Sequence, residues 1–272
     1  QQDPENALLL FAQRNEYQLS FYDLLLHTTR PWLCVVGGAG SGKSFLTRWF
    51  TLVLAGEGPE APPSLRGLVP LRIELRRFAE RLRALRQPGY GLLDYVSEEH
   101  AALKQALCGQ VLRSLYAEKR LYFILDGLDE VAAALRQQVF ELVEAEIQTN
   151  GTRGLVTARP LGTEAIRLRL PERKVREIAL KPFGTAEISE CIERFFLYCF
   201  HRAPEEGRRR RERFLAELSG SPSLRELCSK PLLLRLLLDL ATPGPMPRHR
   251  HLVLRKAVEL LTARWEMHKS GS

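Results

Sequence analysis

The stretch that decides the fold is Gly37-Gly-Ala-Gly-Ser-Gly-Lys-Ser44, which directly follows the apolar run Leu33-Cys-Val-Val36. It fits the pattern G-x-x-x-x-G-K-[ST] at every position. Glycines allow the backbone to curl until successive N–H groups face a polyphosphate, and the helix that follows adds its positive amino end. The pattern therefore predicts a phosphate-binding loop between a buried strand and a helix.

This loop supplies the groups that a nucleotide needs. Lys43 is expected to reach the β- and γ-phosphates of ATP, and the hydroxyl of Ser44 is expected to bind Mg²⁺. A helical stretch at 44–54 follows, so the pattern has the strand–loop–helix context that separates it from a chance run of glycines. The residues expected to contact ATP or ADP are Gly37, Gly38, Ala39, Gly40, Ser41, Gly42, Lys43 and Ser44.

A second chemical feature is the apolar run Leu121-Tyr-Phe-Ile-Leu125, which ends in Asp126. This is a Walker B arrangement, in which a buried strand brings an acid to the sheet edge beside the phosphate loop. Asp126 is therefore expected to hold Mg²⁺ through water. Asp129 and Glu130 follow, and one of them is expected to orient or deprotonate the attacking water. The competing interpretation of this pair is a helix N-cap or first-turn acid.

The order of apolar and polar segments predicts the fold class. Strand candidates at 33–36, 69–75, 121–125, 154–157 and 175–180 are separated by helical stretches at 44–54, 92–118 and 131–148. Such alternation favours an α/β fold, a P-loop NTPase with a parallel five-stranded sheet flanked by helices. After Pro182 the pattern is helical, at 185–200, 211–218, 223–239 and 249–268, which indicates a helical subdomain.

Four parts are expected from this order. They are an N-terminal helical lead-in at 1–30, a nucleotide-binding domain at 31–182, a helical domain at 183–245, and a helix at 246–272 that leads to a missing C-terminal part. The Arg208–Arg211 run, flanked by glutamates, is interpreted as a solvated loop or the start of a helix.

Composition excludes some classes of protein. The 272 residues include 40 Lys and Arg against 32 Asp and Glu, a net charge of +8, which is compatible with nucleic acid but does not identify it. Five scattered cysteines without a C-x-x-C pair indicate reduced thiols in a cytoplasmic protein. Because no apolar run reaches the roughly 18 residues of a membrane helix, no membrane segment is expected.

Several motifs resemble one family. Leu125-Asp-Gly-Leu-Asp-Glu-Val131 resembles the extended Walker B of the NACHT NTPases, a branch of the STAND class of signal-transducing ATPases. Val156-Thr-Ala-Arg-Pro160 resembles the family's T-[ST]-R-P sensor strand, with Ala158 as a departure. Segments 68–76, 178–183, 229–234 and 249–265 are also similar to the family in its order. The phosphate loop alone is generic, whereas the combination of D-G-L-D-E with T-x-R-P is specific.

The resemblance implies further roles. Arg159 would sense the γ-phosphate, although it could also be a surface arginine before a turn proline. Pro231 would line the adenine pocket and could at the same time be the first residue of a helix. The family implies a slow Mg²⁺-dependent ATPase whose nucleotide state controls self-association through the NTPase core. Its setting would be immune or stress signalling, including antiphage defence, with effector and sensor domains outside this segment.

Two other functions stay open at this point. One is a nucleic-acid-dependent ATPase motor or loader, which the charge and the arginine-rich stretch at 66–86 favour. The other is a scaffold that binds nucleotide tightly and never hydrolyses it. A GTPase would need an N-K-x-D type guanine reader, which the sequence lacks, and AAA+ motors usually carry a second acid where Gly127 stands.

Overall fold

The computed structural model describes residues 20–99, 105–160 and 173–242, and single helical residues between 252 and 262. The chain divides into two compact units. The first contains residues 1–38 and 43–180, and the second contains residues 39–42 and 181–272. Most of the expected lead-in and of the last expected helix lie outside the described residues.

The first unit is built on one parallel sheet. Its strands follow the order β2-β3-β4-β1-β5, and every pair is parallel. The strands are β1 (Trp32–Val36), β2 (Val69–Glu74), β3 (Leu121–Asp126), β4 (Arg153–Ala158) and β5 (Val175–Ala179). The predicted five-stranded parallel sheet is therefore confirmed. Since parallel strands all end at the same edge, the phosphate loop after β1 and Asp126 at the end of β3 lie on either side of the end of β4.

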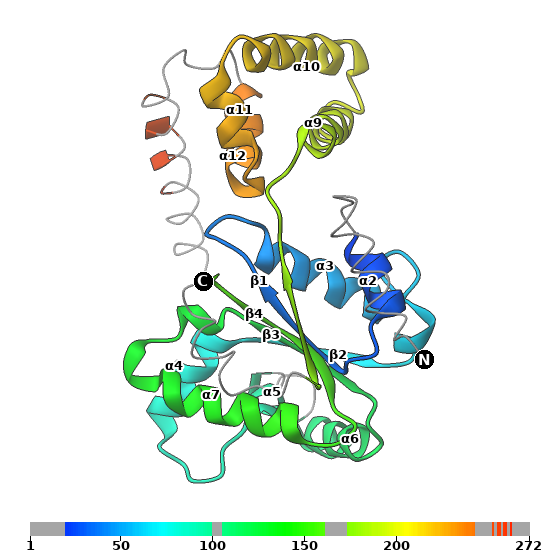
Figure 1. The fold of residues 1–272 in the computed structure, drawn as a ribbon, viewed down its shortest axis with the longest axis vertical. Helices are drawn as coiled ribbons and strands as arrows, with labels where there is room; N and C mark the ends of the chain where they lie inside the picture. The colour runs from blue at the N-terminus through cyan, green and yellow to red at the C-terminus, as the bar shows by residue number, and fades with distance from the viewer. Residues whose placement is uncertain are drawn as a thin grey trace. The chain divides into compact units, whose positions relative to one another are not determined.

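Helices cover both faces of this sheet, which explains its continuous apolar strands. Trp32, Cys34 and Val36 enter one core, where α4 (Leu75–Leu85), α5 (Leu92–Glu99), α6 (Gln105–Ala117) and α7 (Ala133–Gln148) pack. Leu33 and Val35 point to the other face, under α2 (Phe21–His27) and α3 (Lys43–Ala55). Figure 1 shows these two helical layers on opposite sides of the strands.

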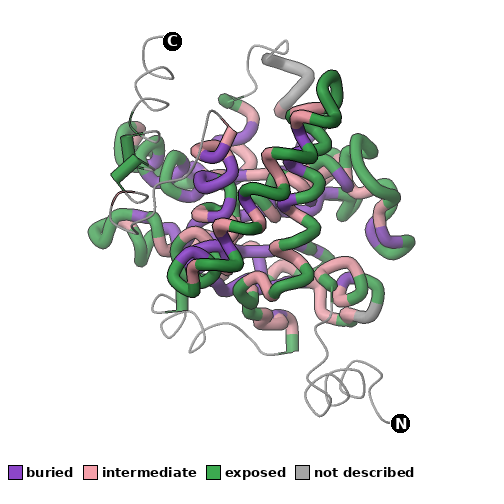
Figure 2. Tube along the Cα trace, turned by 90° about the horizontal axis from the view of Figure 1, so that it is seen from above, coloured by how far each residue is buried: buried purple, intermediate pink, exposed green. Residues whose placement is uncertain are grey.

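Helix α4 was missed by the sequence analysis, which described residues 66–86 only as an arginine-rich stretch. Its buried residues are spaced at i, i+3, i+4 and i+7, and the arginines between them face solvent. Figure 2 shows buried and exposed residues alternating along the turns of helices. A strongly amphipathic helix can therefore look polar by composition alone. The buried residues of α4 are Leu75, Phe78, Ala79 and Leu82.

The second unit has a helical core of its own. It comprises α9 (Thr185–Cys199), α10 (Pro204–Ser219), α11 (Pro222–Cys228) and α12 (Pro231–Ala241). Phe196 and Phe214 are among its most buried side chains. Among the described residues no helix is both long enough and apolar enough to span a bilayer.

Two helix boundaries in this unit were predicted wrongly. The expected helix at 223–239 is two helices, because Pro231 disfavours helical backbone in Lys230, which is extended. The expected helix at 211–218 begins instead at Pro204, so Arg208–Arg211 lies inside α10. Proline at the first position and two glutamates in the first turn are favourable helix-start residues, and they precede the arginine run.

Candidate functional site

The phosphate loop has the backbone that its glycines were expected to allow. Gly40 has a φ of +73° and Gly42 a φ of +96°, which side-chain-bearing residues rarely adopt. Helix α3 then begins at Lys43, so its first N–H groups follow the loop directly. The loop and the helix start therefore form a local anion-binding arrangement.

Lys43 folds back on this loop. Its Nζ donates to the carbonyl oxygen of Gly37 at 2.6 Å and to that of Gly38 at 3.2 Å. Burial lowers the pKa of Lys43, Asp129 raises it, and Arg159 lowers it, with smaller contributions from Glu130 and Asp126. The ammonium group is thus within electrostatic reach of all the charged residues that the sequence analysis selected in this region.

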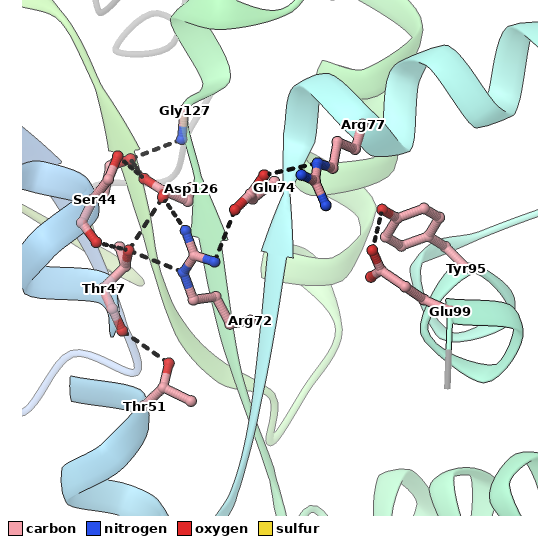
Figure 3. Close-up of polar contacts among 11 residues, drawn as sticks. Ser44, Thr47, Thr51, Arg72, Glu74, Arg77, Tyr95, Glu99, Asp126 and Gly127 are labelled. Carbon is pink, nitrogen blue, oxygen red and sulfur yellow. Dashed lines mark hydrogen bonds and ion pairs between the residues drawn. The ribbon is translucent and has the colours of Figure 1, made fainter. Parts of the chain in front are cut away.

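Asp126 lies at the end of β3 and is almost fully buried. Its Oδ1 accepts from the hydroxyls of Ser44 at 3.3 Å and Thr157 at 2.9 Å. Its Oδ2 accepts from the Thr47 hydroxyl at 3.2 Å and from Arg72 Nη2 at 2.6 Å. Four side chains from two strands, β2 and β4, and one helix, α3, therefore surround this carboxylate, and most of them are labelled in Figure 3.

Asp129 and Glu130 are neighbours in sequence but differ in environment. After Gly127, whose φ is +80°, a short 3₁₀ turn (η2, Leu128–Glu130) buries Asp129 and exposes Glu130. Asp129 Oδ2 pairs with Arg159 Nε at 2.8 Å. Neither acid caps α7, whose N-cap residue is Ala132. Arg159 follows the end of β4, so the middle strand brings it to the acids that follow β3.

The residues present fit a Mg²⁺–nucleotide. A hydroxyl and a carboxylate, Ser44 and Asp126, provide the oxygen ligands that Mg²⁺ prefers. Two buried polar atoms, Asp129 Oδ1 and Ser41 Oγ, have no hydrogen-bond partner in the part of the chain that the structure describes. Since buried polar atoms are nearly always hydrogen-bonded, both are open to a water molecule or a ligand.

Pro231 is the first residue of α12, as one of its two interpretations predicted. Within the second unit, the N–H of Leu232 donates to the carbonyl oxygen of Gly40 at 3.2 Å. A Cβ atom added to Gly42 would lie 3.7 Å from Pro231 Cγ. Residues 39–42 and the start of α12 are therefore packed together, and the adenine contact of Pro231 stays a prediction.

The sequence analysis missed Arg72, Glu74, Thr47 and Thr157. A signal for the first two is the alternation of charged and apolar residues in Leu71-Arg-Ile-Glu74, unusual in a strand with buried neighbours. A signal for Thr47 is its position one helical turn after Lys43 on α3. No local sequence pattern links these residues to Asp126. They meet this carboxylate because of the order and register of the strands.

Comparisons with known proteins show the family of the chain. The sequence profile of the NACHT domain matches residues 32–197, more than half of the chain. Among solved structures, the chain is similar to the Orc1 protein of Aeropyrum pernix in complex with DNA, with a TM-score of 0.41 and 16% identity. That similarity covers 95% of this chain and 64% of the Orc1 chain. No curated protein sequence matches. By its matching domain profile, the chain belongs to the NACHT family of P-loop NTPases.

Proposed function

We propose that this NACHT domain binds Mg²⁺-ATP, hydrolyses it slowly, and acts as a molecular switch whose nucleotide state controls self-association. The observation that carries the proposal is the Asp129–Arg159 pair, which lies within electrostatic reach of Lys43 and has one carboxylate oxygen without a partner among the residues that the structure describes. A buried acid with a free oxygen can accept a proton or orient a water molecule. The half-exposed arginine can bind the terminal phosphate.

Each group then has one task. The loop N–H groups and Lys43 bind the β- and γ-phosphates, and Lys43 exchanges its two carbonyl acceptors for phosphate oxygens. Ser44 and Asp126 hold Mg²⁺, which would neutralise phosphate charge when bound. Asp129 orients the water, Glu130 assists from the surface, and Arg159 distinguishes ATP from ADP.

The switch is supported by how the loop is packed. Residues 39–42 belong to the second unit, where Gly40 accepts a hydrogen bond from the first turn of α12. A phosphate in the loop would therefore change the environment of Leu232 and Pro231 directly. We propose that this contact transmits the nucleotide state to the helical unit and so to other copies of the chain.

The biological setting follows the family. We propose a cytoplasmic role in immune or stress signalling, including antiphage defence, with effector and sensor parts outside this segment. Free thiols at Cys191, Cys199 and Cys228 support a reducing compartment.

The basic composition does not by itself favour a nucleic-acid motor. Many arginines of the 66–86 stretch, which motivated this alternative, and of the Arg208–Arg211 run form ion pairs with acids in the described residues. The pairs are Arg76–Glu80, Arg77–Glu74, Arg81–Glu98, Arg208–Glu205, Arg209–Glu206, Arg210–Glu206 and Arg211–Glu193. These stretches are therefore partly neutralised. Turnover measured with and without DNA or RNA distinguishes the two functions, since a motor would be stimulated.

The central experiment is thermal unfolding with and without Mg²⁺-ATP. A ligand at 100 times its Kd stabilises the native state by about 2.7 kcal/mol, so the wild-type midpoint should rise on the order of 5 °C. We expect Lys43→Ala to lose this rise and Lys181→Ala, an exposed lysine, to keep it. A rise that survives in Lys43→Ala would show that the loop is not the nucleotide site.

Self-association needs its own measurement. Sedimentation velocity with a non-hydrolysable ATP analogue should give larger species than sedimentation with ADP. Lys43→Ala should give the same distribution with both nucleotides. Identical wild-type distributions in the two nucleotides would reject nucleotide-controlled assembly by this segment, while leaving binding and hydrolysis intact.

A further inference from the structure

Arg72 lies where the proposed metal site meets the rest of the sheet. It is on β2, which pairs with β3 in a register that sets Glu74 opposite Asp126. Only 18% of the Arg72 side chain is exposed, against 6% for Asp126. Arg72 Nη2 lies 2.6 Å from Asp126 Oδ2, and Nη1 lies 3.0 Å from Glu74 Oε1. Figure 3 shows the guanidinium between the two carboxylates.

Its position is fixed from three directions. Besides the two carboxylates, Arg72 Nε donates to the Thr47 hydroxyl at 3.2 Å. The same hydroxyl lies 3.2 Å from Asp126 Oδ2, so Thr47, Arg72 and Asp126 form a closed triangle. A guanidinium with three separate partners is held in one orientation, so the positive charge of Arg72 stays beside Asp126.

The arrangement divides the Asp126 carboxylate into two sides. Oδ2 faces Arg72 and Thr47, while Oδ1 faces Ser44 and Thr157. The Ser44 side is the one suited to Mg²⁺, because Ser44 directly follows Lys43 in the phosphate loop, where the hydroxyl that binds Mg²⁺ is expected. A fixed positive charge therefore already balances the acid that a metal ion would use.

We propose that Arg72 is a resident counter-ion of Asp126 that raises the Mg²⁺ concentration the nucleotide site needs. The inference rests on the proposed role of Asp126 in holding Mg²⁺. A cation 2.6 Å from one carboxylate oxygen weakens the attraction of that carboxylate for a second cation and repels it directly. Free Mg²⁺ is thereby disfavoured, whereas Mg²⁺ that arrives with the negative charge of a nucleotide is accepted.

Glu74 opposes this effect. It shares the charge of Arg72 through Oε1, so less of that charge acts on Asp126. Its other oxygen, Oε2, pairs with Arg77 Nε at 3.1 Å. Arg77 is largely exposed and pairs with Glu74 rather than with Asp126, so it serves as a matched control arginine on the same glutamate. Removing Arg72, Glu74 or Arg77 should thus have three different effects on the metal requirement.

The test measures Mg²⁺ dependence of nucleotide binding, with no turnover. The full chain is mixed with a fluorescent, non-hydrolysable ATP analogue at fixed concentration, and Mg²⁺ is titrated while anisotropy is recorded. Binding of Mg²⁺ to the analogue in solution is the same in every sample and cancels between variants. The half-saturating Mg²⁺ concentration is the quantity compared.

For Arg72→Met we expect this concentration to fall on the order of fivefold. Ser44, Thr47 and Thr157 keep their hydroxyls beside the Asp126 carboxylate in this variant. For Arg77→Met the value should stay within about twofold of wild type, because an exposed pair contributes little. An unchanged or higher value in Arg72→Met overturns the proposal.

Glu74→Gln should change the half-saturating Mg²⁺ concentration in the opposite direction. This variant keeps the test possible if Arg72→Met does not fold. With its second carboxylate removed, the guanidinium acts on Asp126 alone, and the half-saturating concentration should rise about twofold or more. A lower or unchanged value overturns the proposal independently. If wild-type nucleotide binding needs no Mg²⁺ at all, the proposed role of Asp126 in holding Mg²⁺ is wrong, and the inference about Arg72 is wrong as well. If wild type needs Mg²⁺ but both variants match it, only the inference about Arg72 fails.

Discussion

Two acid–arginine pairs stand at the carboxyl edge of the same sheet, and they are built differently. In the Arg72–Asp126 pair, 18% of the arginine side chain and 6% of the acid side chain are exposed, and both carboxylate oxygens have partners. In the Arg159–Asp129 pair, 51% of the arginine is exposed, and one buried carboxylate oxygen has no partner among the described residues.

This difference indicates that the two acid–arginine pairs have different roles. A pair whose atoms are all engaged holds neighbouring groups in place, and a further cation must compete with the partners already there. A pair with a free buried oxygen and an exposed arginine can gain a partner and can open at little cost. We therefore assign the first pair to the geometry and metal demand of the site and the second pair to chemistry and nucleotide sensing.

The largest expected effect is a loss of stability, and it should occur when the Arg72–Asp126 pair is broken but not when the Arg159–Asp129 pair is broken. Asp126→Ala leaves the mostly buried Arg72 without its main partner, so the free energy of unfolding should fall by about 3 kcal/mol. Asp129→Ala removes an acid whose partner is half exposed, and the loss should stay below about 1 kcal/mol. Urea unfolding of the nucleotide-free chain measures both.

A double variant sharpens this test. Adding Arg72→Met to Asp126→Ala removes the unpaired guanidinium as well, so part of the lost stability should return. Asp126→Ala and Asp129→Ala losing equal stability would mean that the pairs are energetically alike, against the comparison above.

The next effect concerns hydrolysis. Asp129→Asn keeps the size of the side chain but cannot take a proton, so the single-turnover rate should fall about 100-fold with little change in nucleotide affinity. Glu130→Gln, on the same 3₁₀ turn but exposed, should lower the rate less than about tenfold. A larger loss in Glu130→Gln would exchange the two roles. Wild-type rates in both variants would remove these acids from the mechanism.

These acids also show where sequence reasoning stops. The loop, the five strands and Asp126 were predictable because each rests on a local pattern of apolar runs and glycines. Asp129 and Glu130 could not be distinguished, since a left-handed glycine and a single 3₁₀ turn decide which one is buried. Two adjacent acids in the sequence do not reveal which of them will be buried.

Arg72 illustrates a second limit. Its partner Asp126 is 54 residues away, and the two meet only because β2 lies beside β3 in one register. Strand order and register are set by the whole core, so a single sequence does not reveal this pair. Helix α4 was missed for the opposite reason, because its local composition is dominated by arginines that solvent and neighbouring glutamates satisfy.

A smaller effect should appear in nucleotide discrimination. Arg159→Met removes the exposed guanidinium of the half-satisfied pair, and the preference for ATP over ADP should fall about tenfold. Arg153→Met is the matched control, because Arg153 lies at the other end of β4 and donates to the Ser64 carbonyl at 2.9 Å. Competition binding with both nucleotides measures the ratio. Equal changes in the two variants would argue against γ-phosphate sensing by Arg159.

The smallest effect is electrostatic and tests the comparison at Lys43, which both acids influence. Burial lowers the pKa of Lys43 below its usual 10.5, and Asp129 is the strongest group raising it again, while Asp126 is the weakest of the three acids. The folded chain then binds fewer protons than the unfolded chain between the lowered pKa and 10.5. Stability from this group therefore rises with pH through that window.

Lys43 should respond unequally to the loss of each acid. Asp129→Asn should lower the pKa of Lys43 further than Asp126→Asn does, because Arg72 already balances the charge of Asp126. The pH titration of the ¹³Cε resonance of Lys43 measures both shifts in the nucleotide-free chain. A larger drop in Asp126→Asn would mean that the buried acid keeps its field despite Arg72. In that case Arg72 does not reduce the electric field of Asp126 on the side where Mg²⁺ is proposed to bind. The two acid–arginine pairs would then not differ in their electrostatic effect.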